Sequence, residues 1–215
     1  ATWQQVPGSD RLHPDIITVS EDELKLYKEK KGATAVSSRV IDPFDSSRSW
    51  SMEALRGPEG LRRWQNEDLV PRNGDVFQER LYCIRWIDAD GERRYAAPDA
   101  ADLAGEAFIL ELLTERFADW QRMGFVPSMA ILEGGDKTEE PIRARGWTHW
   151  HHLFTPRQLL MHGLFLELAL QQTGKSKEFY VACLIGIAAA SDWSSKLCRW
   201  TPQLARSGGI GASVQ

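Results

Sequence analysis

The fifteen-residue stretch GWTHWHHLFTPRQLL, residues 146–160, contains the clearest folding signal in the chain. Its second half begins a helix. Thr155 is a favoured N-cap residue, Pro156 stands at the first helical position, where a missing N–H costs nothing, and Gln158 completes a capping box. We therefore predict a helix from Arg157 to about residue 173, where Gly174 ends it.

A second helix follows almost at once. Ser176 is a good N-cap residue, and the helix should reach about Trp193. Between Phe179 and Ala190 the sequence is apolar on every helical face. A helix of that kind is usually surrounded by other elements, so we predict that it lies at the centre of the core.

Upstream, the sequence predicts a third helix and a β-hairpin. Asp99 can cap a helix that runs to about Met123, with an apolar stripe that includes Leu103, Phe117 and Trp120. Residues 76–97 predict a hairpin, because a β-rich run is followed by a turn that ends at a glycine.

We expect an α+β fold. In it, residues 1–98 form an irregular N-terminal region that carries the 76–97 hairpin and packs on the helices of residues 99–215. Residues 33–72 should be irregular, because prolines and glycines interrupt them.

The composition is that of an ordinary globular protein, with 42% hydrophobic and 26% charged residues. The longest apolar run, 179–190, is much shorter than the roughly 20 residues that span a membrane, so we expect no membrane partner. Three widely separated cysteines favour a reducing, cytoplasmic compartment. No P-loop, dinucleotide-binding glycine motif, nucleophile elbow or zinc-protease motif is present, so no catalytic residue and no bound cofactor is predicted for this chain.

Charge is distributed unevenly along the chain. The net charge is −4, yet residues 141–215 contain eight lysines and arginines against three acids. Contacts with phosphate, if there are any, should therefore lie in the last third.

The three histidines at positions 149, 151 and 152 allow several uses. On a strand, His149 and His151 would share a face and could bind a metal together with a carboxylate, but no acid stands nearby in the sequence. Core histidines bonded to the backbone, and histidines that contact nucleic acid or a partner, are the alternatives. We predict no metal site.

Aromatic and basic residues alternate around this stretch and again near residue 200. Aromatic rings stack on bases, and lysine and arginine neutralise phosphates. The candidate nucleic-acid-binding residues are Arg143, Arg145, Trp147, His149, Trp150, Arg157, Lys196, Arg199 and Trp200. The same residue types also dominate protein–protein interfaces, so this alternative stays open.

The tripeptide Asp42-Pro-Phe44 partly matches the D-P-P-[FYW] motif of amino methyltransferases, in which an aromatic stacks on the flipped base. Here the second proline is missing. We interpret it as a turn.

Three segments of the chain resemble a known family: RRWQNEDLVPRNGDVFQERLYCIRW (62–86), RGWTHWHHLFTPRQLL (145–160) and SDWSSKLCRW (191–200). They are similar to large bacterial and archaeal proteins described as adenine-specific DNA methylases with an N-terminal DUF1156 domain. These are often found near phage-defence genes. The resemblance extends from about Arg39 onward. It implies an S-adenosylmethionine-dependent N6-adenine methyltransferase as the parent protein.

The resemblance places the family's glycine-rich cofactor loop before the matching segment and its D-P-P-Y motif after it, and this chain has neither. Where relatives have Cys-Pro-x-Cys, residues 40–47 have no cysteine, which removes support for zinc. We therefore expect a non-catalytic inserted region that positions DNA or braces the catalytic domain. Its expected partners are DNA and the rest of the methyltransferase. The alternative is a protein–protein interaction module that does not contact DNA.

Overall fold

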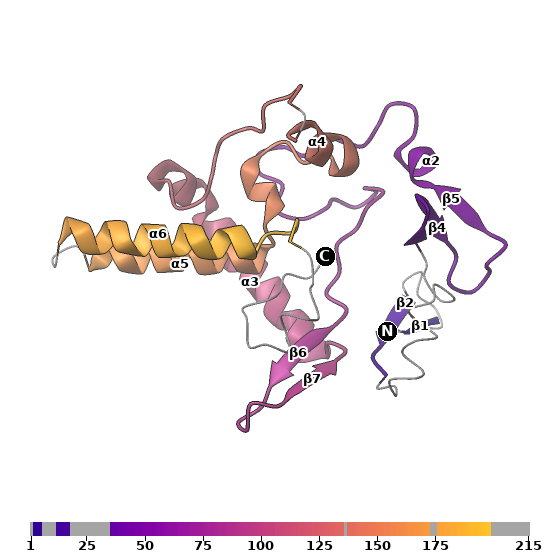
Figure 1. Cartoon of the computed structure of the whole chain (residues 1–215), viewed down its shortest axis with the longest axis horizontal. Coiled ribbons are helices and arrows are strands. Elements are labelled where there is room, and N and C mark those ends of the chain that lie inside the picture. The colour runs from indigo at the N-terminus through magenta and orange to yellow at the C-terminus, as the bar shows by residue number, and fades with distance from the viewer. Residues whose placement is uncertain (1, 6–11, 18–34, 136, 173–175, 199–215) are drawn as a thin grey trace. The chain divides into compact units, whose positions relative to one another are not determined.

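The computed structural model describes residues 2–5, 12–17, 35–135, 137–172 and 176–198 (Figure 1). The chain forms two compact units. Unit 1 comprises residues 1–60 and 78–103, and unit 2 comprises residues 61–77 and 104–215. This division places segment 61–77 with the helices, whereas the predicted boundary at residue 98 placed it with the N-terminal region.

The described residues of unit 1 form three small antiparallel sheets and a short helix. Its elements are β1 (Thr2–Gln5), β2 (Leu12–Asp15), β3 (Ala35–Val36), β4 (Arg39–Ile41), β5 (Ser49–Ser51), α2 (Met52–Arg56), β6 (Ile84–Ile87) and β7 (Arg93–Ala96). With the helices of unit 2, these strands confirm the α+β class.

The predicted irregularity of residues 33–72 is wrong for residues 35–56. Ser37 and Ser38 both have positive φ, 52° and 60°, which gives the two-residue turn that matches the twist of the β3–β4 hairpin. Ser51 then caps α2 by accepting from the Ala54 N–H at 3.0 Å. The Asp42-Pro-Phe44 tripeptide is a turn, as predicted, in which the Asp42 carboxylate accepts from the Phe44 N–H at 2.9 Å.

The predicted 76–97 hairpin is present and its turn is confirmed, but its strands are shorter than predicted. Gly91 has φ 82° and ends the turn, but β6 begins only at Ile84. Ile84 pairs with Ala96. The ladder ends there because Pro98, two residues further along, has no N–H to donate.

Unit 2 is helical. It contains α3 (Ala100–Met123, apart from its first turn), α4 (Glu139–Arg145), the 3₁₀ helix η1 (Trp150–Leu153), α5 (Pro156–Gln171) and α6 (Lys177–Trp193). The capping box predicted at Thr155 is present, and the predicted cap Asp99 also forms one. Thr155 and Gln158 satisfy each other's backbone N–H groups at the start of α5, and Asp99 and Asp102 do the same for α3.

The core of unit 2 lies between α3 and α5. Its buried members are Leu69, Leu113, Phe117, Trp120, Phe125, Val126, Leu159, Leu160 and Leu166. Gly163 of α5 lies against Trp120, and a Cβ added to Gly163 would come within 2.1 Å of the indole ring. The predicted α3 stripe is buried only in its second half, since Leu103 is 47% exposed.

The prediction that α6 lies at the centre of the core is wrong. No residue of α6 is buried. Figure 1 shows α6 lying alongside α5, and a single neighbouring helix can cover only one face of a helix that is apolar all round.

Among the described residues, no helix is long and apolar enough to cross a membrane.

Candidate functional site

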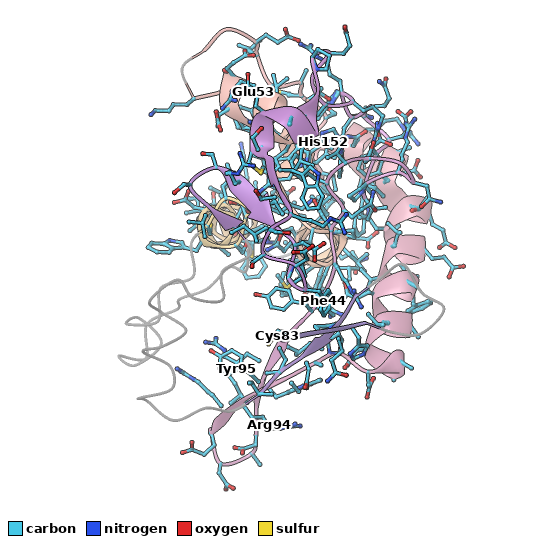
Figure 2. The ribbon with its side chains drawn as sticks, turned by 90° about the vertical axis from the view of Figure 1, so that its right-hand side faces the viewer. Phe44, Glu53, Cys83, Arg94, Tyr95 and His152 are labelled. Carbon is cyan, nitrogen blue, oxygen red and sulfur yellow. The ribbon has the colours of Figure 1, made fainter. Side chains whose placement is uncertain are left out.

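The histidine cluster belongs to the packed interior of unit 2. His151 and His152 stand in η1 and are 0% and 1% exposed, and Figure 2 shows His152 among closely packed side chains. The centroids of these two rings lie 4.3 Å apart. The centroid of the His149 ring is 5.5 Å from that of His151 and 5.4 Å from that of His152.

His152 joins two segments that are far apart in sequence. Its Nδ1 accepts from the N–H groups of Thr148 and His149, at 3.1 and 3.2 Å. Its Nε2 lies 3.1 Å from the carbonyl oxygen of Gln65 and must therefore donate. These roles require the neutral ring. Burial, together with the neighbouring His151 and His149, lowers the pKa of His152 to about 3.

His151 is also held by the backbone. Its Nδ1 donates to the Pro127 carbonyl at 3.0 Å. Its Nε2 is buried without a partner at hydrogen-bond geometry, although the Asn66 backbone interacts with the ring. Burial, followed by the nearby His149, lowers the pKa of His151 to about 4. Both inner histidines are thus neutral structural residues near pH 7.

These hydrogen bonds occupy most of the nitrogens of His151 and His152 that could bind a metal ion. Both nitrogens of His152 and one of His151 are used by backbone groups. Within the described part of the chain, no group of three histidine, cysteine or acidic residues is arranged to hold a metal ion.

Two buried tryptophans extend the cluster. Trp64 and Trp147 are 5% and 6% exposed and meet edge to face at 6.5 Å. The Lys196 ammonium lies over both rings, 5.4 and 5.1 Å from their centroids, while its backbone N–H donates to the Leu153 carbonyl at 2.7 Å. Lys196 therefore fastens the chain beyond α6 to the core of unit 2.

An ion-pair network shapes the loop that supplies Trp64 and Gln65. Arg62 binds Asp75 through two bonds of 2.7 Å, and it also donates to Asp68 at 2.6 Å. The hydrogen bond from Arg62 lowers the pKa of Asp75. Burial alone would raise the pKa of Asp68, but bonds from Arg62, the Gln65 N–H and Arg72 outweigh burial and lower it.

The loop and the 146–152 segment are joined by backbone groups. The Trp64 N–H donates to the Gly146 carbonyl at 2.8 Å, and Thr148 Oγ1 donates to the Trp64 carbonyl at 2.5 Å. Gly146 has φ 76°, and a Cβ there would come within 2.1 Å of the Arg62 carbonyl. The Trp/His-rich segment is thus a structural junction.

The predicted nucleic-acid-binding residues have separate surroundings. Trp147 is buried, and His149 is partly buried within the histidine cluster. Arg143 pairs with Glu140, Arg157 pairs with Glu106, and the Arg145 guanidinium lies 5.4 Å from the Phe77 ring. Trp150 is 38% exposed. Arg199 and Trp200 lie outside the described residues. The buried Trp147 ring does not offer a face to a base, but binding of DNA through the other residues stays a prediction.

A different surface of unit 2 has the character of a binding site. We call α5 and α6 together the apolar hairpin. On α5, Phe165 and Leu168 are each 53% exposed, and on α6 Ile185 is 65% exposed. Between the two helices runs an apolar groove of about 440 Å³. It is lined by Met161, His162, Phe165, Leu168, Ala169, Gln172, Phe179, Cys183, Gly186, Ile187 and Ala190.

This surface was missed by the sequence reasoning, although its signal was present. The all-round apolar character of residues 179–190 predicts burial inside this chain, whereas the same pattern is also typical of a helix covered by another chain or domain.

Comparison of the chain with protein-family models, with curated proteins and with solved structures finds no match.

Proposed function

We propose that this chain is a non-catalytic interaction module whose unit 2 presents the apolar hairpin to a protein partner. The observation that carries the proposal is the exposure of large apolar side chains along both helices of the hairpin. Soluble proteins rarely leave contiguous apolar surface of this extent in contact with water unless it binds something.

The rest of unit 2 fits a supporting role. The backbone bonds of His152, the Trp64–Trp147 pair and the Arg62 network fix the loop and η1 from which α5 begins. A rigid base holds the hairpin in one orientation, which lowers the entropy lost on docking.

The resemblance to adenine-specific DNA methylases supplies the setting that we propose for the module. In a cytoplasmic, S-adenosylmethionine-dependent parent enzyme, the apolar hairpin would brace the catalytic domain. Contact with DNA is the less favoured role, because the Trp147 ring is buried and Arg143 and Arg157 pair with acids.

A dye that fluoresces on apolar protein surface tests the proposal. The folded chain should bind the dye, and replacing Phe165 and Leu168 with glutamine should remove about half of the signal or more, because both side chains are largely exposed. Ile87, which is 60% exposed in unit 1, provides the matched control for a single exposed apolar residue. A folded chain that does not bind the dye would contradict the proposal.

Binding of a DNA duplex at low salt separates the two roles. The proposal expects no salt-dependent binding, and no effect of reversing the charges of Arg143 and Arg145. Affinity that falls steeply with salt, and that falls again in the charge-reversal variant, would favour a DNA-positioning role instead.

A further inference from the structure

The face of α6 that points away from α5 has an unusual pattern. Residues that line the groove toward α5, such as Phe179, Cys183 and Ile187, recur every three or four positions. At about 100° per residue, a second stripe lies on nearly the opposite side of the helix. This outer stripe consists of Lys177, Val181, Leu184, Ile185, Ala188 and Asp192, all of which are exposed.

The outer stripe is complementary to a second copy of itself that runs in the opposite direction. Read from its two ends inward, it places a lysine opposite an aspartate, a valine opposite an alanine, and a leucine opposite an isoleucine. Two identical helices packed antiparallel, with a two-fold axis between Leu184 and Ile185, would bring each residue against its counterpart. Each end would then form a Lys177–Asp192 ion pair.

The other features of α6 are consistent with that packing. Val181 faces the small Ala188, so that a large residue meets a small one, which lets helices approach to 8–10 Å. The only other charged residue of the helix, Glu178, would stand opposite Ser191, so no like charges meet. Antiparallel packing also sets the two helix dipoles in opposition, which is favourable.

From this pattern we infer that the outer stripe of α6 binds the same stripe of a second copy of the chain, antiparallel and about a two-fold axis. The inference rests on the proposed function and names one partner for it. It leaves Phe165 and Leu168 of α5 available for another domain. One helix pair buries less than a standard interface, so we expect a dimer with a dissociation constant in about the micromolar range.

The mass of the full chain, measured by light scattering over a concentration series, is the first test. The wild-type mass should rise toward two copies. Ile185→Asp, at the proposed axis, should weaken the dimer by about tenfold or more, because it would put two carboxylates side by side in an apolar contact. Leu164→Asp on α5, at a position that is 45% exposed, is the matched control and should leave the mass unchanged.

Charge exchange tests the ends of the stripe. Lys177→Asp improves the charge at the N-terminus of α6 and so should not destabilise the helix, but it would face Asp192 of the other copy. We expect it to weaken the dimer a few-fold, and the double variant Lys177→Asp/Asp192→Lys to restore it. A double variant as weak as the single one would overturn the ion-pair assignment.

Cysteine cross-linking tests the direction of packing. In a chain whose three native cysteines are replaced by serine, Ile185→Cys should form a disulfide with its own copy. Val181→Cys should not, because antiparallel packing holds the two copies of that residue about 10 Å apart along the helix axis. A mixture of Val181→Cys and Ala188→Cys chains should cross-link. Cross-linking of Val181→Cys with itself would overturn the antiparallel arrangement.

The outcomes separate the two proposals. A chain that stays monomeric at every concentration, yet binds the apolar dye through its hairpin, overturns the second copy as partner and leaves the docking surface standing. A folded chain that neither dimerises nor binds the dye overturns both.

Discussion

At the residue scale, the histidines of residues 149–152 are the clearest case of one sequence pattern with several uses. The alternative of core histidines bonded to backbone carbonyls is the one that the structure supports, through Pro127 and Gln65. Sequence could not select it, because the acceptors lie 24 and 87 positions away and belong to loops without regular structure. Spacing alone does not report such contacts.

His152 should be the most important of the three for stability. His152→Ala would remove the partner of the Gln65 carbonyl and of two backbone N–H groups and would empty the space of a side chain that is 1% exposed, so we expect a loss of about 2–4 kcal/mol in the free energy of unfolding. Urea unfolding measures this loss. His149→Ala, at a partly exposed ring, is the control and should lose clearly less.

Acid should destabilise the protein through His151 and His152. Their folded pKa values, about 4 and about 3, lie below the ordinary 6.5. Between these pH values the unfolded chain binds the protons and the folded chain does not, so stability falls as the pH falls from about 6.5 toward 4. Two such groups can lower the free energy of unfolding by up to about 2.7 kcal/mol for each pH unit of acidification. Below pH 4, protonation of Asp68 and Asp75 adds to the loss, since their folded pKa values are lowered.

Urea unfolding at pH 7, 6 and 5 measures how steeply the free energy of unfolding falls with pH. His152→Gln removes one of the two rings with the most strongly lowered pKa and should make this pH dependence shallower. Equal stability of the wild type at pH 7 and pH 5 would show that the two rings are not buried as neutral groups.

At the element scale, local signals predicted the starts of α3 and α5 well, because a capping box involves only a residue and the one three positions later. The surroundings of a helix are not a local property. Residues 179–190 have the composition of a core helix, and only the structure shows that α5 covers one face and leaves the outer stripe exposed. The shortened β6 is a similar case, because its pairing ends at Ala96, two residues before Pro98.

Two glycines in the apolar hairpin should respond in opposite ways to the same substitution. Gly163→Ala on α5 would place a methyl group against the Trp120 ring, so we expect a loss of about 2 kcal/mol or more. At Gly186 on α6 an added Cβ meets nothing within 4 Å, so Gly186→Ala should stabilise the helix by about 0.5–1 kcal/mol. Thermal unfolding of both variants at low protein concentration measures the two effects, and a large loss at Gly186 would mean that the groove is closed in solution.

At the scale of the whole molecule, unit 2 combines a tightly bonded base with a pair of helices that leave many large apolar side chains exposed. The base is held by the histidine cluster, the Trp64–Trp147 pair and the Arg62 network. The apolar hairpin places large side chains in water. We expect the base to provide most of the stability of unit 2, and we propose that the hairpin has the binding function.

The most direct test of that assignment is the free energy of unfolding of two matched variants of α5, measured in urea at low protein concentration. Phe165→Gln/Leu168→Gln changes two side chains that are each 53% exposed, and Leu166→Ala changes one between them that is 8% exposed. We expect the double variant to stay within about 1 kcal/mol of the wild type. Leu166→Ala should lose about 2–4 kcal/mol. A double variant that loses as much as Leu166→Ala would show that Phe165 and Leu168 belong to the core of the chain itself, and would rule out this face of the apolar hairpin as a binding surface.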